Sequence, residues 1–155
     1  PYQITSQLLR MLLETVPAPE RIVAMVQKEV AQRICEAPGQ MSLLALSVQY
    51  YGEPKTVTNV PSGSFWPAPK VDSAVIAINS IGKAPRASTP EQFFAIAKAA
   101  YASKRKKMMK NVVGGTPFSA EQVAAAMEAE GLSSNARAQE LSVHQFDSLA
   151  ATLYS

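Results

Sequence analysis

The chain has 155 residues, of which 47% are hydrophobic and 17% charged, and this is the composition of a folded globular protein rather than a disordered one. No apolar run is long enough to cross a bilayer, and the opening residues have neither the basic nor the apolar region of a signal peptide. We therefore expect a cytoplasmic protein without a membrane partner. The net charge of +3 arises from residues 81–155, which hold nine basic and six acidic side chains, whereas residues 1–80 hold six of each.

Cysteine and histidine, two residue types often used in catalysis and metal binding, occur once each. Cys35 has no partner for a disulfide or for metal-ligand spacing, and we expect it to be a small buried apolar group. His144 is also alone, in a helix-start context, and is expected at the surface. The sequence therefore predicts no metal site.

The first predicted elements are a helix and a strand. Thr5 or Ser6 can cap the helix, Pro17 follows its end, and its apolar stripe consists of Leu8, Leu9, Leu12 and Leu13. Residues 21–26 are a short apolar run with β-branched residues. Such a run favours a strand covered on both faces, as in a parallel sheet.

Two more helices and two more strands are predicted before residue 80. Short helices are expected at residues 30–34 and at about 42–51, and strands near residues 55–60 and 71–79. We interpret residues 1–80 as the closing half of an α/β sheet domain.

The remaining residues predict a small helical domain. Residues 81–89 lack periodicity and are interpreted as a linker, and residues 90–155 as an all-helical domain. Its three predicted helices each open with a hydroxyl cap and a glutamine at the third helical position, and the caps are Thr89, Ser119 and Ser142. The apolar residues expected to form its core are Phe93, Phe94, Ala97, Tyr101, Val123, Met127, Leu132, Leu141, Phe146 and Leu149.

A basic interval lies in this second part. Between Glu91 and Glu121 there is no acidic residue, and the basic residues are Lys98, Lys104, Arg105, Lys106, Lys107 and Lys110. Such an interval is either a surface that faces a polyanion or a solvated helix face. On an unbroken helix Arg105 would fall on the buried side, so either the helix ends near Ser103 or Arg105 reaches a carboxylate or phosphate.

A stiff loop is predicted from Phe65 to Ser73. Two prolines spaced by one residue exclude a helix there, and they are expected to restrict the backbone of the preceding aromatic pair, Phe65 and Trp66. Phe65 either packs in the core or stacks on a flat ligand beside a cleft, and Trp66 is expected to pack or to lie at the rim. Lys70 and Asp72 are expected to form a local ion pair.

Five segments, in order along the chain, resemble motifs of the rRNA adenine dimethyltransferases of the KsgA type. They are Pro1 to Ser6, Met25 to Ile34, Phe65 to Ser73, Lys104 to Lys106, and Asn135 to Ser142. The resemblance implies an α/β fold, in which the second half of a Rossmann-like methyltransferase sheet is followed by a small all-helical domain.

The resemblance also implies an activity, which is the S-adenosylmethionine-dependent dimethylation of the exocyclic amine of adenines in small-subunit rRNA. The implied partners are that rRNA and the immature small ribosomal subunit. The carbonyl of Pro1 would accept an amine hydrogen, Tyr2 would stack on the extruded adenine, and Phe65 would close the other side. For Tyr2 the alternative is a chain-end residue that frays in solvent. The side chains expected to contact RNA are Lys28, Lys70, Lys104, Arg105, Lys106, Lys107 and Lys110.

The chain departs from the family pattern at its start. It begins at the proline of the motif, so the catalytic asparagine two residues earlier and the half that holds S-adenosylmethionine are expected to be absent, and the fragment to be inactive alone. A further departure is Lys110, where the family has asparagine. An exposed strand edge in such a half-sheet could pair with a second copy.

Two other functions remain open at this point. One is a non-catalytic rRNA-binding or ribosome-assembly module that keeps the rRNA docking surface and has lost the chemistry. The other is a transcription-factor relative of the same fold that binds nucleic acid through the same basic interval. An asparagine two residues before Pro1, preceded by a glycine-rich loop after a strand, would favour the enzyme.

Overall fold

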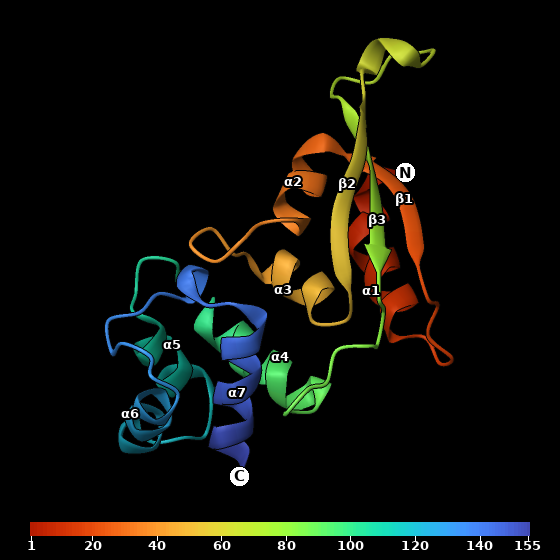
Figure 1. Ribbon diagram of the computed structural model, residues 1–155. Coiled ribbons are helices and arrows are strands. Elements are labelled where there is room, and N and C mark those ends of the chain that lie inside the picture. Colours follow the sequence, from red (N-terminus) through yellow and green to blue (C-terminus); the bar gives the residue numbers. More distant parts are fainter. The chain divides into compact units, whose positions relative to one another are not determined.

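The computed structural model describes residues 1–155 and divides them into two compact units (Figure 1). The sheet unit consists of residues 1–36 and 44–85, and the helical unit of residues 37–43 and 86–155. No helix in either unit has both the length and the apolar content needed to cross a membrane.

The sheet unit is built on three strands, β1 (Ile22–Gln27), β2 (Glu53–Val60) and β3 (Ser73–Asn79), in the order β1-β3-β2 (Figure 1). β3 lies in the middle and is antiparallel to both neighbours, with Ala24 opposite Ile76 and Thr56 opposite Ile76. Both β1 and β2 are therefore edge strands, and a β-bulge lies between Thr56 and Thr58.

The prediction that β1 is covered on both faces, as in a parallel sheet, is wrong for this structure. Its burial alternates, because Ile22 and Val26 are buried whereas Val23 is 63% exposed and Met25 is 45% exposed. The run is apolar on both faces, so the residue pattern cannot indicate that helices cover one face only.

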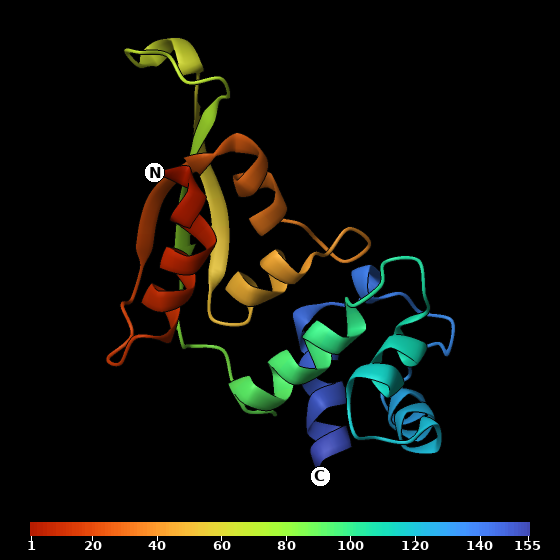
Figure 2. The same cartoon turned by 180° about the vertical axis from the view of Figure 1, so that it is seen from behind.

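Helices cover one face of the sheet (Figure 2). They are α1 (Thr5–Glu14), α2 (Lys28–Ile34) and α3 (Leu43–Gln49), and a short 3-10 helix, Tyr2–Ile4, precedes α1. Alternate residues of β1 and β3 point to the helices, and the core formed between them contains Leu9, Leu13, Ile22, Val26, Ala31, Ile34, Val48, Ala74, Ile76, Ile78 and Ile81. The half-buried Cys35 packs at its margin.

Neither predicted cap of α1 is used. The N-cap is Ile4, without a side-chain hydrogen bond, and the hydroxyl of Thr5 donates to the carbonyl of Tyr2 at 3.0 Å. The 3-10 helix runs directly into α1. The hydroxyl of Thr5, which was expected to accept from a backbone amide, instead donates to the carbonyl of Tyr2 in that 3-10 helix.

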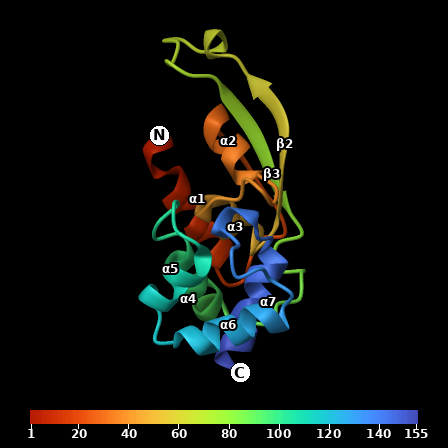
Figure 3. The ribbon, with the colours of Figure 1, turned by 90° about the vertical axis from the view of Figure 1, so that its left-hand side faces the viewer.

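The helical unit has four α-helices: α4 (Pro90–Ala100), α5 (Met108–Gly115), α6 (Ala120–Ala129) and α7 (Val143–Tyr154) (Figure 3). α4 packs against α5 and α7, and α6 packs against the same two helices. The predicted capping boxes are confirmed at α4, α6 and α7, where the hydroxyls of Thr89, Ser119 and Ser142 accept from the amides of their paired glutamines. α5 has no side-chain cap, so the sequence carried no signal for its start.

Most of the predicted helical core is confirmed. Phe93, Phe146 and Leu149 are fully buried, and the ring of Phe146 packs edge-on to Phe93 with ring centroids 6.3 Å apart. A 3-10 helix, Ala138–Glu140, precedes α7. The short segment 37–43 packs with this unit, because the amides of Gly39 and Met41 donate to the carbonyl of Gln139 at 2.9 and 3.1 Å.

A buried carboxylate anchors the start of the helical unit. Asp147 of α7 is 3% exposed and accepts from the amide of Ala87 at 2.7 Å, and from the amide and hydroxyl of Ser88 at 3.0 and 2.5 Å. Burial raises the pKa of Asp147, but these hydrogen bonds and the charge of Arg86 outweigh it, so that the net shift is downward. The carboxylate thus ties residues 87–88 to α7.

Candidate functional site

The loop between β2 and β3 extends beyond the end of the sheet and closes at its base (Figure 3). It contains a 3-10 helix, Ser62–Ser64, and the amide of Ser62 donates to the carboxylate of Asp72 at 2.9 Å. The expected ion pair between Lys70 and Asp72 does not form. The carboxylate instead accepts a backbone amide ten residues away, and this hydrogen bond joins the two ends of the loop.

The aromatic pair of this loop is not in the core. Phe65 is half-buried, and Trp66 is 96% exposed, so the packing alternative is wrong for Trp66. An exposed indole on a loop whose ends are fixed is a surface to which a flat ligand can bind.

Tyr2 is ordered at the root of the same loop. Its half-buried side chain shares a hydrogen bond with the fully buried hydroxyl of Ser73, the first residue of β3, which directly follows the loop. In the structure the side chain of Tyr2 therefore lies against the start of β3 and is not free at the chain end. The carbonyl of Pro1 accepts the amide of Ile4 at 3.4 Å and keeps a second lone pair for another donor.

Tyr2 and Phe65 do not touch in the structure. No ring contact joins them, although Tyr2 is hydrogen-bonded to Ser73 and Phe65 lies in the loop that Ser73 follows. Tyr2 instead borders a hollow of about 250 Å³ between the start of α1 and β1, lined by Pro1, Tyr2, Ile4, Thr5, Leu8, Leu9, Ala24, Met25 and Val26.

Lys28 lies near acidic groups. It is the first residue of α2, its amide donates to the carbonyl of Asp72 at 3.0 Å, and it borders a hollow of about 390 Å³. The same hollow is lined by the carboxylates of Glu29 and Asp72, which oppose the approach of a phosphate. Lys70, on the loop, is exposed.

The main basic residues lie on a turn and not on a helix. α4 ends at Ala100, residues 101–107 form turns, and Lys104, Arg105, Lys106 and Lys107 are all exposed. Of the two alternatives for this interval, the one in which the helix ends near Ser103 is therefore right. Because Arg105 is exposed, it needs no buried partner.

Asn111 holds this turn in place, and sequence reasoning missed it. It is 7% exposed, and its side-chain amide donates to the carbonyls of Ala100 and Ser103, each at 2.8 Å. The first carbonyl belongs to the last residue of α4 and the second lies three residues beyond it, where backbone acceptors lack helical partners. No motif marks Asn111 in the sequence, because its burial and its two acceptors are known only from the folded structure.

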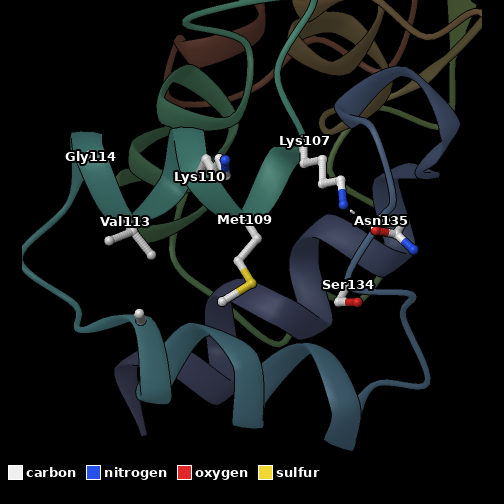
Figure 4. Close-up of a pocket in the computed structure, with 8 residues that line it drawn as sticks. Lys107, Met109, Lys110, Val113, Gly114, Ser134 and Asn135 are labelled. Atoms are coloured by element: carbon white, nitrogen blue, oxygen red, sulfur yellow. Dashed lines mark hydrogen bonds between the residues drawn. The ribbon is translucent and has the colours of Figure 1, made fainter.

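A second attachment holds the end of the turn. The ammonium of Lys107 donates to the side-chain carbonyl of Asn135, and the amide of Met108 donates to the carbonyl of Ala136 at 3.0 Å (Figure 4). Lys107 and Lys110 both line a hollow on this side of α5. Residues 133–136 are thus brought beside the basic turn.

The cations of this region lack acidic partners. None of Lys104, Arg105, Lys106, Lys107 and Lys110 forms an ion pair, whereas Arg10 pairs with Glu14 on α1. Unpaired surface cations on a firmly held turn can neutralise several phosphates, and such contacts account for most non-specific affinity for nucleic acid.

Comparison with known proteins gives one consistent family. A family model described as "Ribosomal RNA adenine dimethylase" matches residues 1–154. A protein of Dehalococcoides mccartyi named ribosomal RNA small subunit methyltransferase A is 39% identical over 150 residues, covering 96% of this chain and 52% of that protein. A protein of the same name from Synechococcus elongatus is 38% identical, covering 99% of this chain and 57% of that protein.

Two solved structures share the fold. A dimethyladenosine transferase from Plasmodium falciparum matches with a TM-score of 0.79 at 22% identity, over 96% of this chain and 62% of that one. The 23S rRNA methyltransferase ErmE matches with a TM-score of 0.72 at 24% identity, over 100% of this chain and 63% of that one. The fold prediction is thereby confirmed, and the chain spans about half the length of the curated relatives it matches.

Proposed function

The chain belongs to the ribosomal RNA adenine dimethylase family, and from this premise we propose that it forms the adenine-facing and RNA-binding part of an rRNA adenine dimethyltransferase. The proposed reaction of the whole enzyme is S-adenosylmethionine-dependent dimethylation of adenine exocyclic amines in small-subunit rRNA. The observation that carries the RNA-binding role is the set of five exposed, unpaired cations at residues 104–107 and 110.

Positioning is the chemistry that this part would supply. The exocyclic amine of adenine is a weak nucleophile because its lone pair is delocalised into the ring, so its orientation toward the methyl donor governs the rate. The free lone pair of the Pro1 carbonyl would accept one amine hydrogen. Tyr2, oriented by Ser73, would support one face of the extruded base, and Phe65 would close the other when RNA binds.

This role requires the loop to close over the base, since Tyr2 and Phe65 do not touch. The loop ends are held by Ser62 and Asp72, so the movement would involve the residues between them. Stacking on aromatic side chains is worth on the order of 1–3 kcal/mol per base and would contribute to holding an unpaired adenine.

The residues around Tyr2 do not fit a cofactor site. The hollow there is lined by apolar side chains and by the two hydroxyl-bearing side chains Tyr2 and Thr5. It has no charged side chain for the ribose or for the amino and carboxylate groups of S-adenosylmethionine. Members of this methyltransferase family use S-adenosylmethionine, and we propose that residues outside this chain hold it.

RNA binding is tested by charge reversal. The variant Lys104→Glu, Lys106→Glu, Lys107→Glu should weaken binding to a small-subunit rRNA hairpin and flatten its salt dependence by roughly one slope unit for each phosphate that is no longer neutralised. The matched control reverses three exposed cations of the sheet unit, with Arg21→Glu, Lys55→Glu and Lys83→Glu. Equal reductions of affinity in both variants, or none in the first, would refute the role of the turn.

Adenine binding is tested with the chain's single tryptophan. Trp66 is adjacent to Phe65 and 96% exposed, so its fluorescence should change when an unpaired adenine occupies the loop. Phe65→Ala should weaken the titration with an adenine-containing hairpin. The same hairpin with an abasic residue at that position should give no change in emission, and a response to both hairpins alike would argue against base recognition.

Cofactor binding is tested by calorimetry. This chain should give no measurable heat with S-adenosylmethionine, and a clear micromolar isotherm would contradict the proposed division of the site. The non-catalytic rRNA-binding alternative rests on the same cations. An asparagine two residues before Pro1 in the longer protein would favour the enzyme, and its absence would favour the non-catalytic module.

A further inference from the structure

The helical unit contains a hollow to which the proposed function assigns no ligand. Its volume is about 550 Å³, within the range of roughly 300–1,000 Å³ usual for small-molecule pockets. One wall is α5 and the other is the start of α6 with residues 134–135 (Figure 4). The lining residues are Lys107, Met109, Lys110, Val113, Gly114, Ala120, Ser134 and Asn135.

One end of this hollow is apolar and the other is polar. The side chain of Met109 points into the space between α5 and α6, beside Val113 and the bare backbone of Gly114 (Figure 4). Asn135 and Ser134 lie at the opposite end, where Asn135 accepts from Lys107. An apolar slot with an amide and a hydroxyl at one end suits a flat heterocycle whose edge carries donors and acceptors.

The charge of the lining selects an anionic ligand. Lys107 and Lys110 are its only charged side chains, and no carboxylate lines it. The nearest acid along the chain is Glu121, which follows Ala120 and is exposed outside the lining. Lys107 is also the last cation of the basic turn, so the hollow continues the surface already proposed to bind RNA.

We propose that this hollow binds one unpaired RNA base, with the adjoining phosphate on Lys107 or Lys110. The base would lie against Met109 and Val113, and Asn135 would hydrogen-bond its edge. This site is separate from the adenine at Phe65, and it rests on the proposed function because it requires RNA on the basic turn. It would fix where the RNA sits by recognising a bulged or loop nucleotide.

The hollow can be filled from either wall without disturbing the core. A β-carbon at Gly114 would meet no atom within 4 Å, so Gly114→Leu would project into open space. Ala120→Leu fills the hollow from the opposite wall, where Ala120 is exposed. The matched control is Ala125→Leu, an equal apolar addition at an exposed position of α6 that does not line the hollow.

The test uses the full chain and a short RNA hairpin with one bulged nucleotide, compared with the same hairpin carrying an abasic residue at the bulge. The wild type should bind the bulged hairpin at least about fivefold more tightly, from the burial of one base against apolar side chains. Gly114→Leu and Ala120→Leu should each remove this preference and leave the abasic hairpin's affinity unchanged. Ala125→Leu should keep the preference.

Other outcomes overturn the inference in distinguishable ways. If the wild type binds both hairpins equally, with a strong salt dependence, RNA binding stands and the base site is refuted. If the filling variants weaken both hairpins alike, the hollow contacts RNA backbone and not a base. If they change neither affinity, RNA does not occupy the hollow and an acidic protein segment becomes its candidate ligand. If the wild type binds neither hairpin, the proposed function fails together with this site.

Discussion

The two units differ in how much apolar surface they leave exposed. Of the ten large hydrophobic side chains that are exposed, Tyr154 alone belongs to the helical unit. The other nine belong to the sheet unit and are Ile4, Leu8, Met11, Val16, Val23, Met25, Val57, Trp66 and Val71. Single exposed apolar residues are ordinary, but here nearly all of them belong to one unit.

The cause of this difference is architectural. The helical unit surrounds its core with four helices, three of which have complete capping boxes. The sheet unit has a core on one face only, and its edge strands β1 and β2 each pair with β3 alone. The helical unit therefore has the features of a self-contained fold. The sheet unit has those of a part that packs against something further.

The largest expected effect is in the helical core. Phe146→Ala removes a fully buried ring and should cost about 3–5 kcal/mol of unfolding free energy. Urea denaturation followed by circular dichroism measures it. The matched aromatic truncation in the sheet unit is Trp66→Ala, which should stay within about 0.5 kcal/mol because the side chain is 96% exposed. Similar destabilisation in the two variants would contradict the contrast between the units.

Asp147→Asn should produce the next largest effect. The amide introduces a donor among the amides of Ala87 and Ser88, and the unfolding free energy should fall by about 1–3 kcal/mol at neutral pH. Because folding lowers the pKa of Asp147, its stabilisation is complete above the ordinary carboxyl pKa and is lost as pH falls through the lowered value.

The difference in stability between wild type and Asp147→Asn should therefore be constant from neutral pH down to about 5, and shrink below about pH 4. Denaturation midpoints at several pH values measure this. Asp72→Asn is the control in the sheet unit, where the carboxylate is exposed and the destabilisation should be smaller. If the stability difference between wild type and Asp147→Asn grew toward acid pH, it would contradict a lowered pKa for Asp147.

Two adjacent glycines test how closely the helices pack. A β-carbon at Gly115 would lie 2.9 Å from that of Ala99 on α4, whereas one at Gly114 would meet nothing within 4 Å. Gly115→Ala should cost about 1–3 kcal/mol by overpacking, and Gly114→Ala should be neutral or slightly stabilising. Thermal unfolding of the two variants measures the difference. Equal unfolding free energies for Gly115→Ala and Gly114→Ala would mean that α4 and α5 do not approach so closely.

The smallest effect on stability is expected on the uncovered face of the sheet. Val23→Lys should change the unfolding free energy by about 0.5 kcal/mol or less, because Val23 is 63% exposed, and it should reduce self-association through this face and edge. Sedimentation velocity measures the association. The neighbouring Ile22→Lys, on the covered face, should instead unfold the unit. If Val23→Lys were the more destabilising of the two, the helices would have to cover the other face of the sheet.

Much of the local structure could be predicted from the residues. The capping boxes at Thr89, Ser119 and Ser142 depend on neighbours three residues apart, and all three are confirmed. The absence of a helix at residues 65–72 follows from the prolines there. The covered face of β1 could not be predicted, because the strand is apolar at each position from Ile22 to Val26 and so carries no alternation.

In the candidate site, too, some features could be predicted from the sequence and others could not. Its residue types and their family motifs were visible in the sequence, including the cations at residues 104–107. The interactions that hold them were not, because Tyr2 and Ser73 are 71 residues apart, and Lys107 and Asn135 are 28 apart. Asn111 carries no motif and is recognisable only from the two carbonyls that it reaches.

The residues alone were enough to establish most elements, the family and the acid-free interval, because caps, prolines, periodicity and charge act over a few residues. The folded structure was needed to show that the cations lie on a turn, that segment 37–43 packs with the helical unit, and that the sheet has one covered face. These features depend on which distant groups meet, and their hydrogen bonds and burial exist only once the chain has folded.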